Sequence, residues 1–234
     1  ESWGLIPLLQ SPAELEAALD AHSRLWFVLD TMRWQRNYSP EFRTLVWQRL
    51  VPVSFQRKVL VFRSDPEPLS PAAHQLNEVD FGGQVGLVST ELEKIEVQPG
   101  DSLRLAFNWQ AQVPLMQDYS VFVHVDDAEG ETLALADAGA TGGVFPMYEW
   151  QPGDLIVDRR VVVLPADLPP GRYRLNVGLY SPDTLERLPV VAGGDPVARQ
   201  ATAAFFWVGE RPAVPPPLYP MAAGFGGQIC LQGY

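Results

Sequence analysis

The sequence has 234 residues, of which 47% are hydrophobic and 19% charged, and its formal net charge is -11. This balance is typical of a folded chain with a sizeable core and excludes an intrinsically disordered one. The negative charge lies in the second part, because residues 1–68 carry eight acidic and eight basic side chains and the rest carry twenty acidic and nine basic. A field of that sign repels phosphate backbones, so we expect no nucleic acid partner.

Residues 1–68 have the pattern of a small α/β segment. Ser11 and Ser39 are each followed by a proline, a combination that predicts a helix N-terminus at both places. The apolar runs Leu25–Leu29 and Lys58–Arg63 predict strands, the first of a kind buried on both faces of a parallel or mixed sheet, and Leu5–Leu9 is a candidate earlier strand. So short a segment has difficulty covering both faces of a sheet, so we expect the tail of a larger domain.

The second part of the chain has the pattern of an all-β domain. Prolines at 66, 68 and 71 break helix and sheet, and residues 69–78 are predicted to be a linker. From 79 to 210, short strands are separated by proline-glycine turns, as at Gln98–Asp101 and Gln151–Asp154. Apolar and polar residues alternate along Leu103–Trp109 and Tyr173–Leu179. The sequence therefore predicts a mainly β fold, an antiparallel β-sandwich of the Ig-like or jelly-roll-like kind.

An internal repeat links the middle of the chain to its end. Phe81-Gly82-Gly83-Gln84-Val85-Gly86-Leu87 returns as Phe225-Gly226-Gly227-Gln228-Ile229-Cys230-Leu231. The distance between the copies is about the length of one sandwich, so we interpret residues 211–234 as a linker and the first strand of a truncated second repeat.

The sequence contains no familiar catalytic signature. Phosphate-binding loops, zinc-protease, nucleophile-elbow and CxxC motifs are all missing, so we expect no enzyme activity from this chain. His22, His74 and His124 lack the spacing of metal ligands, and the acidic turn Asp126–Glu131 does not match the EF-hand calcium pattern. Cys230 is alone and cannot form an internal disulfide. We expect no cofactor and no metal.

Three side chains are candidates for ligand binding. His124 alternates with Phe122 and Asp126 on one face of a predicted strand, where a carboxylate could orient the imidazole. Tyr148 and Trp150 lie in a loop that follows a glycine-rich stretch, where an exposed aromatic plate could stack on a sugar ring. The alternative is that Trp150 fills one end of the sandwich core.

The quoted residues also resemble a known family. Arg24–Val28 and Val59–Arg63 resemble the end of the extracytoplasmic region of polytopic membrane glycosyltransferases of the dolichyl-phosphate-mannose mannosyltransferase type. The second part is similar to β-sandwich modules appended to such transferases in some bacteria. That similarity is carried by Pro99-Gly100-Asp101, Phe107-Asn108-Trp109, Tyr119–His124, Trp150–Asp154 and Pro170–Tyr180.

This resemblance implies a parent enzyme that moves a sugar from a polyprenyl-phosphate carrier. The transmembrane helices and acidic loops of such enzymes have no counterpart in this sequence, so no catalytic residue is carried over. The implied role is an accessory domain on the extracytoplasmic face of the membrane, with the transmembrane part of the same polypeptide and a glycan or lipid-linked sugar as partners. The alternative is a carbohydrate-binding module of a secreted or surface protein, and a glycan hydrolase that uses paired carboxylates is a third hypothesis.

Overall fold

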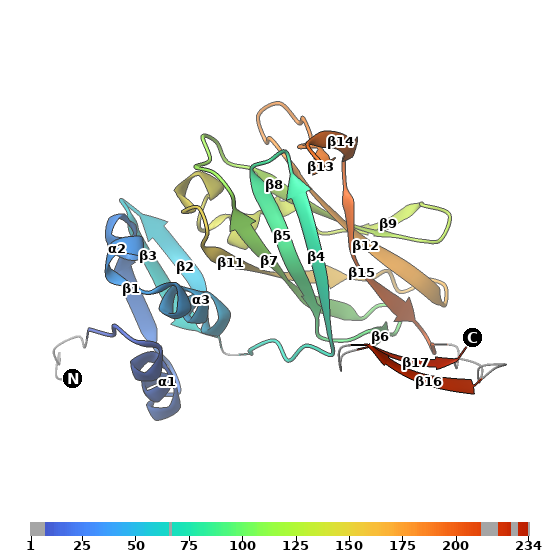
Figure 1. Cartoon of the computed structure of the whole chain (residues 1–234), viewed down its shortest axis with the longest axis horizontal. Coiled ribbons are helices and arrows are strands. Elements are labelled where there is room, and N and C mark those ends of the chain that lie inside the picture. The colour runs from blue at the N-terminus through green and yellow to red at the C-terminus, as the bar shows by residue number, and fades with distance from the viewer. Residues whose placement is uncertain (1–7, 66, 212–219, 226–228, 234) are drawn as a thin grey trace.

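The computed structural model describes residues 8–65, 67–211, 220–225 and 229–233. It is mainly β, with a small helix-containing unit beside two packed antiparallel sheets (Figure 1). The fold class predicted from the sequence, a β-sandwich preceded by a small α/β segment, is therefore confirmed.

The α/β unit begins with capped helices, as predicted. The Ser11 hydroxyl accepts the Glu14 N–H, and the Glu14 carboxylate accepts the Ser11 N–H in return. The Ser39 hydroxyl accepts the Phe42 N–H in the same way. The elements of this unit are α1 (Pro12–Ala21), β1 (Trp26–Asp30), η1 (Thr31–Arg33), α2 (Trp34–Asn37), α3 (Pro40–Arg49), β2 (Leu50–Gln56) and β3 (Val59–Ser64).

The sheet of this unit corrects one prediction. Its order is β1-β3-β2 and both pairs are antiparallel, so the parallel or mixed sheet expected around β1 was wrong. Only one face is covered: Phe27 packs against Phe42 of α3, whereas Trp26 and Val28 are 56% and 57% exposed. An antiparallel sheet can leave one face open, and a continuous apolar run does not reveal this.

Strand β2 was missed by the sequence analysis. It joins β3 through a tight turn in which Arg57 and Lys58 both have positive φ, a geometry that usually requires glycine or asparagine. The turn therefore has no sequence signal. The predicted strand Leu5–Leu9 lies mostly outside the described residues.

Two six-stranded sheets form the sandwich. One has the order β11-β7-β5-β4-β13-β14, and the other has the order β10-β8-β12-β15-β6 with β9 paired to β8. The first sheet contains β4 (Ala73–Phe81), β5 (Val85–Leu92), β7 (Ser102–Ala111), β11 (Leu155–Val163), β13 (Val190–Ala192) and β14 (Asp195–Ala198). The second contains β6 (Glu96–Val97), β8 (Ser120–Asp126), β9 (Thr132–Leu135), β10 (Ala138–Gly139), β12 (Gly171–Tyr180) and β15 (Ala201–Val208). The β15–β6 pair is parallel and the other pairs are antiparallel.

The start of the sandwich is earlier than predicted. Strand β4 begins at Ala73, inside the stretch 69–78 that was expected to be a linker, and Ala73 is the partner of Leu92 on β5. A bulge lies between Leu76 and Val79, and Glu78 within it has a φ of 49°. This interruption breaks the alternation by which the strand could have been recognised.

Both copies of the internal repeat lie at hairpin turns. Phe81 ends β4 and pairs with Val85, which begins β5. Phe225 ends β16 (Pro220–Phe225) and pairs with Ile229, which begins β17 (Ile229–Gly233). The residues flanking the glycines thus have the same strand pairing in the two copies, while residues 226–228 lie outside the described part of the chain.

The α/β unit is fixed to one sheet of the sandwich. Arg159 on β11 donates to the carbonyl oxygens of Trp47, Gln48 and Leu50, where α3 ends, at 3.2, 2.7 and 3.3 Å. Arg43 of α3 forms a 2.8 Å ion pair with the buried Asp154. These contacts lie on β11 and the turn before it, next to the α/β unit in Figure 1. They occupy the outer side of the β11 sheet, and the second sheet is left to present the other outer face.

Candidate functional site

The loop that holds Tyr148 and Trp150 is a structural plug. Trp150 is 1% exposed, and its indole nitrogen donates to the Phe145 carbonyl oxygen at 3.3 Å. Trp150 therefore fills the end of the core and cannot stack on a sugar, which corrects the aromatic-plate hypothesis. Tyr148 is 50% exposed on η3 (Met147–Glu149), whereas His124 lies on β8.

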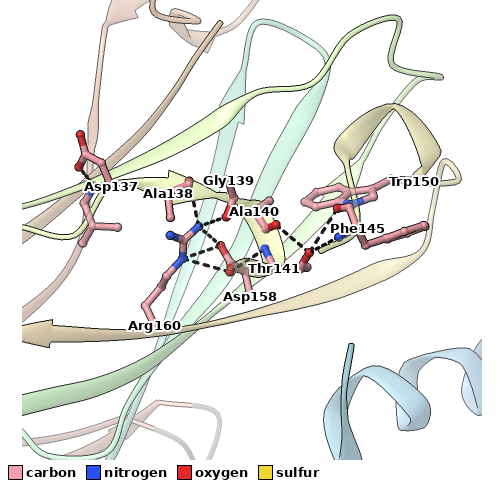
Figure 2. A network of polar contacts seen from close by, with 10 residues as sticks. Asp137, Ala138, Gly139, Ala140, Thr141, Phe145, Trp150, Asp158 and Arg160 are labelled. Carbon is pink, nitrogen blue, oxygen red and sulfur yellow. Dashed lines mark hydrogen bonds and ion pairs between the residues drawn. The ribbon is translucent and has the colours of Figure 1, made fainter. Parts of the chain in front are cut away.

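A buried polar network fixes the glycine-rich turn beside this plug (Figure 2). Asp158 and Arg160, both on β11, form a bidentate pair with contacts of 2.8 to 3.1 Å. The Asp158 carboxylate also accepts the Thr141 N–H at 2.9 Å, and Arg160 donates to the carbonyl oxygen of Gly139 at 2.9 Å. Burial raises the pKa of Asp158, and the charge of Arg160 opposes that shift. Asp158 and Arg160 thus each bond the backbone at or next to η2 (Ala140–Gly143), and these bonds hold η2 in place.

The outer face of the second sheet is exposed in part: Phe205 is 43% exposed there, whereas Phe122, Asp126 and Asn176 are 1%, 4% and 5% exposed. Strand register defines which side chains share it. Across β15, β12 and β8, the rows on this face, named here the open face, are Trp207 with Arg172, Phe205 with Arg174 and Asp126, Thr202 with Asn176 and His124, and Gly178 with Phe122. The residues that alternate with these along each strand, such as Val123 and Leu175, point to the other side of the sheet and are buried in the core.

A network of hydrogen bonds makes the centre of the open face rigid. Asn176 donates to one oxygen of Asp126 at 2.6 Å, and the Thr132 hydroxyl donates to the other at 2.7 Å. The Thr202 hydroxyl donates to the side-chain oxygen Oδ1 of Asn176 at 2.7 Å. Both Asp126 oxygens are thus occupied, so this carboxylate supports the face and is not placed to act as a base.

His124 shares the open face with Phe122 and Asp126, as the alternation predicted. The carboxylate that lies near its ring is that of Asp137, 4.0 Å from Nε2. The Asp126 carboxylate instead accepts hydrogen bonds from Thr132 and Asn176. Burial lowers the pKa of His124, while Asp137 opposes the shift. A lowered pKa leaves the imidazole uncharged near neutral pH, as a hydrogen-bonding group and a flat ring.

One end of the open face forms an aromatic groove. Its volume is about 340 Å³, and the Phe205 ring, 43% exposed, lies on its wall. The Arg172 guanidinium lies over that ring, 4.0 Å from its centroid. The groove is lined by Ile95, Arg172, Phe205, Trp207 and Arg211.

This groove was not predicted from the sequence. Ala203–Val208 is apolar throughout, so alternation could not show which side chains face outward. The usable signal is on the neighbouring strand, where Arg172 and Arg174 alternate with core residues and their register partners Trp207 and Phe205 share their side.

In the acidic turn Asp126–Glu131, the Asp127 carboxylate accepts hydrogen bonds from the backbone of the turn itself. Asp127 accepts the N–H groups of Gly130 and Glu131, each at 2.8 Å. Within the described residues, no group of three or more His, Cys, Asp or Glu side chains is arranged to hold a metal ion. None of the helices described here is both long and apolar enough to traverse a bilayer.

The chain defined by this fold is an antiparallel β-sandwich protein with an appended α/β unit. It matches no protein-family model and no curated protein sequence. Among solved structures it is similar to the C-terminal domain of Wzt, at 12% identity and a TM-score of 0.43, over 62% of this chain and 83% of that one.

Two further solved structures are similar over part of the chain. A calcium-binding mutant of Bacteroides uniformis beta-glucuronidase 2 matches at 12% identity and a TM-score of 0.35, over 74% of this chain and 20% of that one. A CARDB domain from Pyrococcus furiosus, in complex with di-metal ions, matches at 15% identity and a TM-score of 0.29, over 62% of this chain and 97% of that one. At such values no ligand or activity is inferred from these likenesses.

Proposed function

We propose that this chain is a non-catalytic carbohydrate-binding β-sandwich whose ligand lies along the open face. The observation that carries the proposal is the aromatic groove at the end of that face, where the exposed Phe205 ring and Trp207 lie beside the guanidinium groups of Arg172 and Arg211. Sugar rings present apolar C–H faces and hydroxyl edges. A surface that combines flat rings with fixed donors and acceptors suits both.

Rigidity supports the same proposal. Asp126 and Asn176 are 4% and 5% exposed and are held by each other and by two threonines. These two buried side chains order the face from beneath, and a face that is already ordered loses little entropy when a ligand binds.

The test is polysaccharide binding by affinity electrophoresis and calorimetry with a panel of glycans. Phe205→Ala is expected to weaken binding roughly tenfold, which corresponds to about 1.4 kcal/mol of stacking and contact energy. Trp26→Ala is the matched control, because Trp26 is an exposed aromatic residue of the α/β unit, at the opposite end of the molecule in Figure 1. Retention of no glycan by the unaltered chain would reject the proposal.

We also propose that the chain serves as an extracytoplasmic accessory region of a membrane glycosyltransferase acting on lipid-linked sugars. Besides the sequence resemblance, this is supported by the uncovered face of the β1-β3-β2 sheet, where Trp26, Val28 and Val59 are 56%, 57% and 40% exposed. A contiguous apolar patch of this kind suits packing against another unit.

A coding region that continues into membrane helices with acidic outer loops is the expected result for this role. A signal peptide leading directly into residue 1 would reject it in favour of a secreted module. Transfer activity from a lipid-linked sugar by the isolated chain would reject the non-catalytic assignment.

A further inference from the structure

The open face concentrates positive charge in an acidic protein. Beyond residue 68 the sequence has nine basic side chains against twenty acidic ones. Four of those nine belong to this face or its edge, and none of the four forms an ion pair within the described part of the chain: Arg172, Arg174, Arg187 and Arg211.

The arginines on the other sheet behave differently. Arg104, Arg159 and Arg160 each bond a carboxylate, at 2.8 to 3.2 Å. Arg174 instead donates to the carbonyl oxygen of Asp127 at 2.9 Å, and Arg187 lies over the Phe122 ring, 4.1 Å from its centroid. Carboxylates thus pair with the arginines of the covered sheet, whereas the arginines on or beside the open face form no ion pair among the described residues.

The aromatic groove places two of these arginines beside flat rings. Arg172 and Arg211 both line it, together with Phe205 and Trp207 of β15. A guanidinium presents parallel N–H donors that match the two oxygens of a carboxylate or phosphate. The groove volume of about 340 Å³ is at the lower end of the range for small-ligand sites, roughly 300–1,000 Å³.

We propose that this groove binds an acidic saccharide, with a sugar ring against Phe205 and Trp207 and its carboxylate or phosphate group at Arg172 and Arg211. The inference rests on the proposed glycan-binding function and specifies the ligand class. Glu96 on β6 is the register partner of Trp207 and is exposed, so its charge opposes the anion and limits affinity.

Calorimetry of the whole chain with four probes tests the ligand class. The probes are a polyuronate, a phosphodiester-linked glycan, a neutral glucan of similar length and polyglutamate, which is a polycarboxylate without sugars. One or both acidic glycans are expected to bind at least tenfold more tightly than the glucan and polyglutamate. Binding of the polyuronate alone identifies a carboxylate as the recognised group, and binding of the phosphodiester glycan alone identifies a phosphate.

Variants locate the site. Arg172→Gln is expected to weaken acidic-glycan binding about tenfold, which corresponds to about 1.4 kcal/mol, since it removes one charge-assisted contact. Arg33→Gln, which removes the same charge from the α/β unit where Arg33 is 72% exposed, is expected to have no effect. Glu96→Gln is expected to tighten binding. Circular dichroism of each variant checks that it is folded.

The outcomes separate the two proposals. Equal binding of the neutral glucan, unaffected by Arg172→Gln but lost in Phe205→Ala, would overturn the acidic-saccharide inference and keep the glycan-binding function. Polyglutamate binding as tight as polyuronate binding would overturn the inference as well, because it would show general attraction of polyanions. Binding of none of the saccharides would reject both proposals.

Discussion

Replacing Arg160 with methionine is expected to destabilise the protein strongly, because it leaves the Asp158 carboxylate buried without its counterion. Asp158 is fully buried and loses its contacts to the guanidinium while it keeps the Thr141 N–H, and the Gly139 carbonyl oxygen loses the Arg160 donor. Removing one partner of a buried ion pair costs about 3–5 kcal/mol. For a chain of this size such a loss lowers Tm by roughly 10 °C.

The pH dependence of this loss distinguishes an electrostatic cause from lost packing. Burial already raises the pKa of Asp158, and without Arg160 nothing of equal strength opposes that shift. The native variant then takes up a proton at a pH where the unfolded chain does not, so its stability rises as pH falls through that window. The recovery is at most about 1.4 kcal/mol per pH unit.

Urea unfolding at about pH 7 and about pH 5, followed by circular dichroism, measures both effects. The double variant Asp158→Leu with Arg160→Met is the matched control, since it removes both charges and is expected to lose less stability than Arg160→Met alone. A loss below about 1 kcal/mol, or one that is the same at both pH values, would refute the electrostatic reasoning.

Three further predictions concern other parts of the structure. Because the pKa of His124 is lowered, its imidazole binds a proton less readily in the native protein than in the unfolded chain, so stability falls as pH drops below about 6.5. His124→Gln is expected to flatten this pH dependence of Tm in thermal unfolding. An unchanged pH profile in the variant would contradict the lowered pKa of His124. Gly178→Ala places a Cβ onto the Phe122 ring and is expected to cost about 1–3 kcal/mol in urea unfolding, an effect that should shrink in the Phe122→Leu background. Arg159→Met removes the donor to three carbonyl oxygens at the end of α3 and is expected to speed proteolysis at residues 66–72; cleavage at the unaltered rate would show that Arg159 does not anchor the α/β unit.

Much of the sandwich could be predicted because its strands face the core on one side and solvent on the other. Leu103–Trp109 and Tyr173–Leu179 show that alternation directly, and both correspond to observed strands, β7 and β12. Strand β2 could not be predicted because Arg57 and Lys58 adopt a turn geometry that their residue types do not favour. The start of β4 was hidden by the bulge at Glu78.

The candidate site was predictable only in part. His124 was placed correctly on a face with Phe122 and Asp126, since the alternation of β8 is regular. Trp150 was open to two interpretations because the burial of a loop side chain depends on what packs over it, and here it lies in the core. Phe205 and Trp207 were missed because a wholly apolar strand does not specify its outward side, which becomes known only from pairing with β12.

The anchoring of α3 to β11 has a mechanical consequence. Arg159 donates to the carbonyl oxygens of Trp47, Gln48 and Leu50 at the C-terminal end of α3, and Arg43 adds an ion pair to Asp154. The connection between the two units is therefore rigid and not a flexible linker. If the open face binds a polysaccharide as proposed, the bound polymer is held at a fixed angle and distance from the α/β unit. The spacing of binding sites along the polymer, and not flexibility of the chain, then decides whether a second copy can bind at the same time.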